Sequence, residues 1–311
     1  MAPLLLHDNP FPGIRSYEIN EDELFFGREL QVNELIEKLF QTRFLAIVGS
    51  SGCGKSSIIK AGIIPALLKN KTEHPVSSWA MSVFRPADDP IGNLAESLTA
   101  GNAKAKDIAT ELRSGKDGLV RVLQTLTNPE EQSRLIIIDQ FEELFRFKKS
   151  RTTFHTILET AAFIDLILFA IDQTEVPVYI ILSMRTDFLD ECTEFRGLSE
   201  AINRGYYLVP RMNSRERRLA ITGPVGVKGC KITEELVECL LNDVGDDPDQ
   251  LPIMQHSLMR TWDYWTLNRI GDQPIGMEHY TAIGTIVIQD CNFGFHPWAV
   301  TGFGIILEKH L

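Results

Sequence analysis

One short segment, GSSGCGKS at residues 49–56, restricts the possible folds of this chain more than any other feature. It has the spacing G-x-x-x-x-G-K-[ST], with an apolar run at 44–48 before it. The segment at 57–68 that follows has apolar residues at near-helical spacing. A strand, a glycine-rich loop and a helix in this order are the context in which such a loop holds phosphate. A chance match in a flexible loop would lack these neighbours, so the segment predicts a phosphate loop within an α/β fold.

The residue types in this loop explain how it would bind phosphate. Glycines let the backbone curl so that several N–H groups point at phosphate oxygens, beside the positive end of the following helix. We expect Lys55 to reach the β- and γ-phosphates and the Ser56 hydroxyl to ligate Mg²⁺. The other loop residues predicted to contact the nucleotide are Gly49, Ser50, Ser51, Gly52, Cys53, Gly54 and Ser57.

An apolar run that ends in an acid, LIIID at 135–139, predicts the metal-binding partner of this loop. A continuous apolar run is typical of a strand covered by helices on both faces. Asp139 would emerge at the carboxyl end of that strand, where ligands bind open α/β sheets. We expect its carboxylate to hold Mg²⁺ through water, because this ion keeps much of its hydration shell. The alternative is an ordinary core strand followed by the acidic first turn of a helix.

Two further carboxylates, Glu142 and Glu143, follow within one turn of Asp139. Either could orient or deprotonate an attacking water, and Glu142 is the preferred candidate. The sequence does not decide between them, because one of the two could simply face solvent.

A third apolar run, at 176–183, leads to Arg185. Its guanidinium could fork onto the γ-phosphate and report its presence. The alternative is a structural ion pair on a loop, in which case Arg211 and Arg215 are the next candidates. Proteins that recognise guanine usually carry an Asn-Lys-x-Asp element after such a strand. This sequence has none, so ATP is favoured over GTP.

Five blocks, in order along the chain, resemble the novel STAND NTPases, a branch of the signal-transduction ATPases with numerous domains that is related to AAA+ proteins. The blocks lie at 9–17, 25–29, 49–56, 138–145 and 182–188. The fourth, IDQFEELF, is the most specific, since phosphate loops alone occur in very many families. The resemblance covers about residues 9–285 and implies ATP or ADP with Mg²⁺ as the ligands.

The resemblance also implies roles for residues outside the phosphate loop. In such proteins the backbone of the FFGRE block lies near the adenine, which places Gly27 and Arg28 beside the nucleotide. The segment LPIM at 251–254 is similar to the family's G-x-P region, although Gln250 stands in place of the glycine. Pro252 is therefore a candidate nucleotide contact, while a proline early in a helix is also structurally ordinary.

The alternating pattern of elements predicts a P-loop three-layer sandwich with a mostly parallel five-stranded sheet. Strands are expected at 44–48, 78–84, 134–139, 177–183 and 205–209, with a core helix at 156–170. Helices follow at 233–244 and 250–268, after one that opens with Ser214 as its capping residue. The predicted domains are a lead-in at 1–43, the NTPase core at 44–210, a helical lid at 211–273 and a partial winged-helix region at 274–311.

Composition argues against several classes of protein. A net charge of −11 argues against a nucleic-acid partner, which would need a basic face. The 5 cysteines are odd in number and lack C-x-x-C spacing, so neither zinc nor a disulfide framework is predicted. The expected compartment is therefore the reducing cytoplasm. No targeting peptide is apparent, and the apolar run at 161–170 falls short of the ~20 residues of a membrane span.

The last segment, 287–311, fits the family pattern poorly. Glycine and proline interrupt what should be a long helix, where they would cost about 1 and 3 kcal/mol. This segment is expected to be either a native part of the winged-helix region or an altered tail. The repeat or effector region that such proteins usually carry is not among residues 1–311, so the chain is expected to be a fragment or a product with an altered tail.

Two functional classes remain in view. The favoured one is an ATP-dependent molecular switch in signal transduction, which hydrolyses slowly and acts through self-association or a downstream effector. The competing class is a nucleotide-bound scaffold that does not hydrolyse. A DNA-binding initiator-type ATPase is disfavoured by the acidic balance, and a small-molecule kinase by the helical lid and the IDQFEELF block.

Overall fold

The computed structural model describes residues 9–69, 78–126, 133–150, 154–244 and 251–290. The chain forms two compact units, which are treated separately below. The sheet unit comprises Leu30–Ser51 and Ile63–Pro210. The helical unit comprises the residues up to Glu29, the turn Gly52–Gly62, and the chain from Arg211 onward. The phosphate loop therefore begins in one unit and continues into the other.

A five-stranded sheet forms the centre of the sheet unit, as predicted. Its strands, in spatial order, are β2 (Trp79–Phe84), β3 (Ser133–Ile138), β4 (Val178–Arg185), β1 (Phe44–Gly49) and β5 (Tyr206–Leu208). Every neighbouring pair is parallel, so all carboxyl ends meet at one edge. The three central strands are buried along almost their whole length, which explains their continuous apolar sequences.

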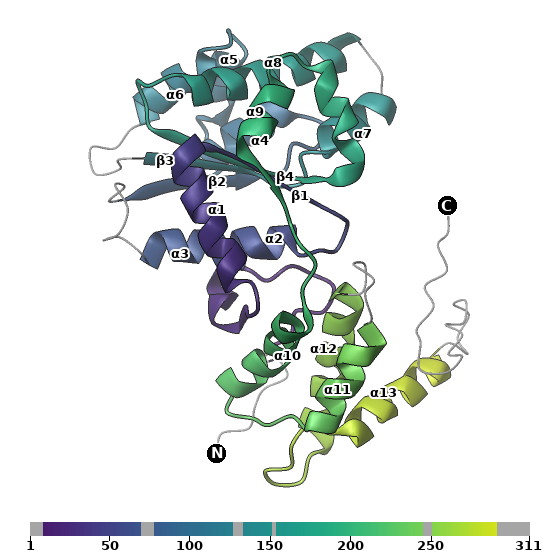
Figure 1. Ribbon diagram of the computed structural model, residues 1–311. Coiled ribbons are helices and arrows are strands. Elements are labelled where there is room, and N and C mark those ends of the chain that lie inside the picture. Colours follow the sequence, from purple (N-terminus) through teal and green to yellow (C-terminus); the bar gives the residue numbers. More distant parts are fainter. Residues whose placement is uncertain (1–8, 70–77, 127–132, 151–153, 245–250, 291–311) are drawn as a thin grey trace. The chain divides into compact units, whose positions relative to one another are not determined.

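Helices cover both faces of this sheet (Figure 1). One face carries α4 (Pro90–Leu98), α5 (Ala105–Leu112), α6 (Gly118–Leu126), α8 (Phe154–Asp172) and α9 (Leu198–Gly205). The other carries α1 (Glu29–Thr42) and α3 (Ile64–Lys69). The main core lies under the first group, where α8 buries Phe163, Ile164 and Ile167. The predicted core helix at 156–170 is thus part of a longer helix.

The helical unit is built from α10 (Ser214–Val227), α11 (Glu234–Val244), α12 (Leu251–Asn268) and α13 (Met277–Asp290). Its core contains Ile221, Leu236, Leu258 and Trp262, joined by Phe11 from the N-terminal segment. The capping residue of α10 is Asn213 rather than the expected Ser214, which is the first helical residue. The Asn213 side chain accepts the Glu216 N–H, and the Glu216 carboxylate accepts the Asn213 N–H.

Two further features bear on the sequence analysis. The predicted winged-helix region contains α13, and its part from residue 291 onward lies outside the described residues. None of the described helices is long and apolar enough to cross a membrane.

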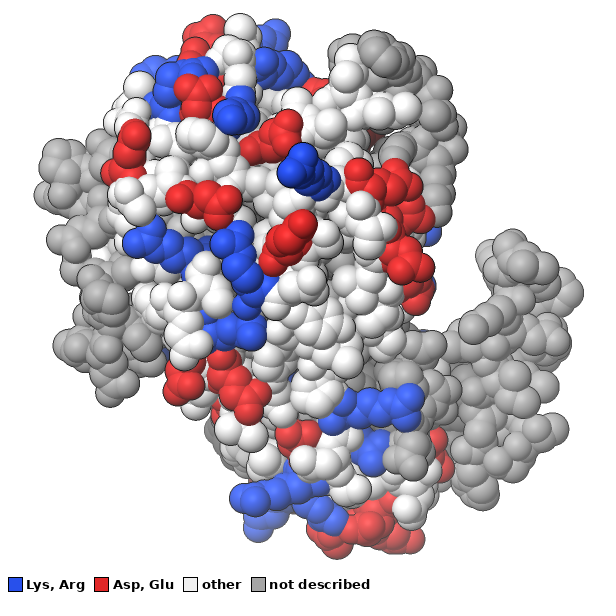
Figure 2. All heavy atoms as spheres, turned by 45° about the horizontal axis from the view of Figure 1, so that its top comes forward, with Lys and Arg blue, Asp and Glu red and all other residues white. Residues whose placement is uncertain are grey.

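Charged side chains of both signs are interspersed on the face shown in Figure 2. Several are paired locally, as in the contacts of Arg113 with Asp89 and Glu159. Such exposed pairs contribute little stability each.

Candidate functional site

The carboxyl edge of the sheet collects the residues predicted to handle the phosphates. Strand register pairs Gly49 at the end of β1 with Arg185 at the end of β4. It also pairs Ile138 on β3 with Leu182 on β4. Asp139 and Ser183 follow these paired residues, so both reach the same edge. Ligands bind open α/β sheets at this edge.

Asp139 is a buried carboxylate, only 4% exposed. The Ser183 hydroxyl donates a hydrogen bond of 2.6 Å to its Oδ1, and Arg85 Nε lies 3.9 Å from its Oδ2. A buried charge is tolerated only when it is paired and hydrogen-bonded, and both conditions are met here. Neither Ser183 nor Arg85 is predicted from the sequence as a partner of Asp139. The available signals are a serine in an otherwise apolar strand end and a basic residue directly after β2.

The chain turns sharply after Asp139. Gln140 has a positive φ of 58°, which is uncommon for a residue with a side chain. Its N–H donates to the Ser183 hydroxyl at 3.0 Å, and the Phe141 N–H donates to the Ser183 carbonyl at 2.8 Å. Ser183 therefore fixes both the carboxylate and the turn that follows it.

The two candidate carboxylates after this turn differ in their surroundings. Glu143 Oε2 accepts the backbone N–H of Ala87 at 3.1 Å, which anchors the loop after β2. Glu142 is buried, at 6% exposed. Glu143 therefore anchors the loop after β2, whereas Glu142 is enclosed by the sheet unit.

Arg185 forms an ion pair with Asp187, two residues further along the chain. The side chain of Arg185 is 35% exposed, so it lies at the surface of the sheet unit. Arg185 is the last residue of β4 rather than part of a loop, so both of its predicted roles stay open. The other two candidate arginines, Arg211 and Arg215, belong to the helical unit.

The remaining turn of the phosphate loop belongs to the helical unit. Gly52 and Gly54 have φ values of 74° and 96°, in the left-handed region that favours glycine. A Cβ on Gly52 would lie 2.8 Å from Cγ of Pro252, the second residue of α12. Pro252 therefore packs directly on the loop. A Cβ on Gly54 would meet nothing within 4 Å, so open space adjoins the loop at that position.

The FFGRE block lies beside the same turn of the loop. The buried Arg28 guanidinium donates to the Cys53 carbonyl at 3.4 Å, which braces the loop backbone. Gly27 has a φ of 82°, and a Cβ there would collide with the Glu216 carbonyl oxygen of α10. The FFGRE block therefore contacts both the phosphate loop and α10.

Three loop residues have contacts that bear on their predicted roles. Lys55 Nζ lies 3.9 Å from the Cys53 sulfur. The Ser57 hydroxyl accepts the Tyr17 N–H at 3.2 Å, so its oxygen is engaged by the N-terminal segment. Ser56 lies between them in the short helix α2 (Lys55–Ser57).

A parallel α/β sheet with a glycine loop after β1 and an acid after β3 defines a P-loop NTPase. The model of the family Novel STAND NTPase 1 matches residues 10–288, and the chain belongs to this family. No curated relative matches the sequence.

The solved structures that match this chain are distant in sequence. The ORC2 protein of Aeropyrum pernix, in ADPNP–ADP complexes, is 12% identical with a TM-score of 0.52, over 92% of this chain and 77% of that one. The RuvB Holliday junction branch migration motor of Thermotoga maritima is 13% identical with a TM-score of 0.47, over 88% and 73%. Domain III of the replication initiation protein DnaA of Thermotoga maritima is 12% identical with a TM-score of 0.48, over 84% and 92%. The likeness to ORC2 shows a shared fold only.

Proposed function

We propose that this protein binds Mg-ATP through its phosphate loop and works as a slowly hydrolysing molecular switch in signal transduction. The observation that carries the proposal is the buried Asp139, held by Ser183 at the sheet edge where β1 leads into the loop. Membership of the NTPase family supports nucleotide binding. In the proposed role the protein acts in the cytoplasm, through self-association or on a downstream effector.

The donor set is of the kind that Mg²⁺ prefers. This ion takes oxygen ligands and keeps several of its waters. We propose the Asp139 carboxylate and the Ser56 hydroxyl as its oxygen ligands, as the sequence predicts. When bound, Mg²⁺ would offset the negative charge of the phosphates during attack on the γ-phosphate.

The open space beside Gly54 supports phosphate binding at the loop. Lys55 would supply charge to the β- and γ-phosphates, and the left-handed glycines would direct backbone N–H groups at the oxygens. Gly27 and Arg28 are proposed to lie near the adenine, and Pro252 is proposed to contact the nucleotide. The contacts of Arg28 and Pro252 with the loop support this assignment.

The non-hydrolysing scaffold remains the second candidate, because Arg185 is paired with Asp187. An arginine held in a structural pair would not distinguish ATP from ADP. A ligand can shift a conformational equilibrium only by its differential affinity for the two states. The scaffold would therefore bind both nucleotides equally well and switch nothing.

Glu142→Gln is expected to preserve ATP binding and to slow single-turnover hydrolysis about a hundredfold, because general-base catalysis contributes on that order. Glu143→Gln serves as the matched control, since it makes the same change in a residue that anchors the Ala87 loop. Its amide oxygen can still accept the Ala87 N–H, so both the melting temperature and hydrolysis should stay close to wild type. Quenched-flow measurement with both variants tests the assignment, and equal rates in wild type and Glu142→Gln would contradict it.

Arg185→Ala is expected to weaken binding of a non-hydrolysable ATP analogue by about ten- to hundredfold, the equivalent of one lost charge-assisted contact. Affinity for ADP should stay nearly unchanged, because ADP lacks the γ-phosphate. Arg185→Lys should restore little, since an ammonium cannot reproduce the planar fork. Titration calorimetry with both nucleotides makes the comparison. Equal losses for the two nucleotides would assign Arg185 to the Asp187 ion pair alone and favour the scaffold.

A further inference from the structure

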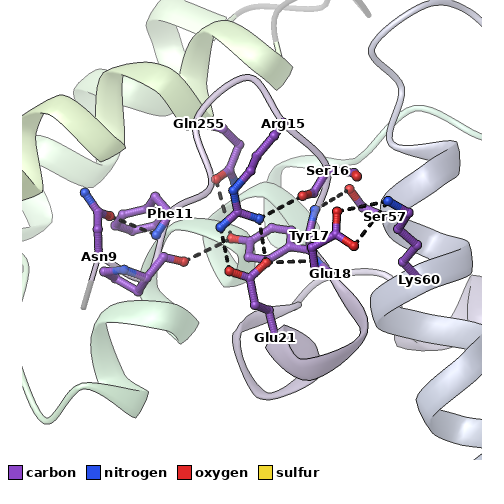
Figure 3. Close-up of polar contacts among 11 residues, drawn as sticks. Asn9, Phe11, Arg15, Ser16, Tyr17, Glu18, Glu21, Ser57, Lys60 and Gln255 are labelled. Carbon is purple, nitrogen blue, oxygen red and sulfur yellow. Dashed lines mark hydrogen bonds and ion pairs between the residues drawn. The ribbon is translucent and has the colours of Figure 1, made fainter. Parts of the chain in front are cut away.

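Residues 9–21, here called the N-terminal strap, contact two elements of the helical unit that are distant in sequence (Figure 3). One is the start of the helix that follows the phosphate loop, at Ser57 and Lys60. The other is α12, whose second residue is Pro252. The proposed function makes no use of this segment.

Asn9 attaches the strap to α12. Its side-chain amide donates to the Met259 carbonyl at 2.9 Å and to Asp263 Oδ1 at 2.8 Å. Its own Oδ1 accepts the Phe11 N–H at 2.9 Å. Both N–H donors and the acceptor of this side chain are therefore used. The two bonds to α12 join residues 250 and 254 positions apart in the sequence. Covering an apolar helix face would not require these three hydrogen bonds.

Apolar contacts reinforce this attachment. Phe11 is 3% exposed, and its ring meets that of Trp262 edge to face at 6.4 Å. Gly13 has a φ of 70°, and a Cβ there would lie 2.7 Å from the Met259 sulfur. The strap backbone therefore passes close to the Met259 side chain of α12, and the positive φ is what favours glycine at this position.

Tyr17 connects the α12 end of the strap to the phosphate-loop helix. Its hydroxyl lies 3.4 Å from both the Pro10 carbonyl and Gln255 Oε1, and its backbone N–H donates to the Ser57 hydroxyl. Burial raises the pKa of the Tyr17 phenol well above its ordinary value. The phenol therefore stays protonated and able to donate at any physiological pH.

Two ion pairs complete the strap near the loop. The Glu18 carboxylate pairs with Lys60 Nζ at 2.9 Å, and Arg15 forms a two-point pair with Glu21. These groups are partly exposed, so each pair contributes little energy by itself. Their effect is to fix the direction in which the strap leaves the phosphate-loop helix.

A single face of α12 serves both the strap and the loop. Pro252, Gln255, Met259 and Asp263 are spaced three and four residues apart, which aligns them along one side of a helix. Pro252 contacts Gly52 of the phosphate loop, and the other three contact the strap. The contacts thus form a closed circuit. The phosphate loop contacts Pro252 of α12, α12 contacts the strap, and the strap contacts Ser57, which directly follows the loop.

We infer that the N-terminal strap positions Pro252 against the phosphate loop, with Asn9 and Tyr17 as its positioning residues. The inference rests on the proposed nucleotide binding. If the circuit holds the loop in its binding shape, nucleotide occupancy and strap docking are thermodynamically linked. Nucleotide must then tighten the strap by the same factor as the strap tightens nucleotide. A change in how residues 9–21 dock on α12 would therefore change nucleotide affinity.

The first test measures nucleotide affinity by titration calorimetry with a non-hydrolysable ATP analogue and Mg²⁺. Asn9→Ala is expected to weaken binding at least about fivefold, the lower end of ordinary coupling between sites. Tyr17→Phe keeps the ring and removes only the hydroxyl, so it should fold normally and weaken binding less. Arg218→Ala is the matched control, because it breaks exposed ion pairs with Glu234 and Glu238 in the same unit. It should bind like wild type.

The second test separates positioning from general stability. In wild type, the nucleotide should slow amide hydrogen exchange at residues 9–18, and Asn9→Ala should abolish this effect. The losses caused by Asn9→Ala and Pro252→Ala should be less than additive, because both act through the same contact with Gly52.

The outcomes distinguish the strap from the proposed function. If wild type binds nucleotide but exchange in the strap is unchanged, or if both strap variants bind like Arg218→Ala, the strap inference is overturned and nucleotide binding stands. Additive losses in the double variant would also overturn it. If wild type binds no nucleotide, the proposed function fails and the strap inference fails with it.

Discussion

Lys55→Ala is expected to remove nearly all stabilisation of the protein by nucleotide. In wild type, a nucleotide at 100 times its dissociation constant should add about 2.7 kcal/mol to the free energy of unfolding. Lys55 is predicted to supply charge to two phosphates, and losing a strong charge-assisted contact corresponds to about a hundredfold in affinity. The same nucleotide concentration would then leave the variant close to half occupied, with little shift in melting temperature.

Lys106→Ala is the matched control for this experiment, because it removes the same charge from an exposed position of α5. Its melting temperature should rise with nucleotide as that of wild type does. Thermal unfolding of the three proteins, with and without Mg-ATP, makes the comparison. An equal rise in wild type and Lys55→Ala would remove the phosphate-loop assignment on which the proposed function depends.

Much of the sheet could be predicted from the sequence because its strands are covered on both faces. Such strands are continuous apolar runs bounded by polar or turn residues, and those runs are visible without tertiary information. The expected strand at 44–48 and the observed β1 at Phe44–Gly49 differ by one residue. The parallel order also follows, since helices separate the strands along the chain.

The sequence failed where a choice depended on side-chain contacts. Ser214 and Asn213 are both capping residue types, and only the hydrogen bond to Glu216 identifies Asn213 as the cap. Glu142 and Glu143 are chemically identical, and the burial of Glu142 and the Ala87 contact of Glu143 become visible only in the fold. The sequence predicts Ser183 only as a strand residue, because strand periodicity carries no information about which hydroxyl meets a carboxylate.

The strap was recognisable only as a block resembling the family. Its contacts join residues 250 positions apart, as in the bond from Asn9 to Met259. Local propensity describes neighbours in the chain, so it cannot reveal that Asn9 meets α12 or that Tyr17 meets Ser57. The proposed effect of the strap on nucleotide affinity is inferred from these contacts alone.

Asp139→Asn is expected to abolish most of the Mg²⁺ dependence of ATP binding while leaving the fold intact. The asparagine has the same shape, and its carbonyl oxygen can still accept the hydrogen bond from Ser183 that Asp139 Oδ1 accepts. The charge that would face the metal is lost, together with the ion pair to the half-exposed Arg85, which contributes little stability. A carboxylate that holds Mg²⁺ through water acts as an outer-shell partner, and losing such a partner typically costs about 10–100-fold in metal affinity.

The measurement is the affinity for a non-hydrolysable ATP analogue in excess Mg²⁺ and in excess chelator. In wild type, Mg²⁺ should strengthen binding, and in Asp139→Asn the two affinities should nearly coincide. Asp165→Asn controls for the change in net charge, because Asp165 is an exposed acid on α8. It should keep the full Mg²⁺ effect. If Asp139→Asn retains that effect too, the buried carboxylate is a structural partner of Ser183 and Arg85, and the metal ligand must be sought among Glu142 and Glu143.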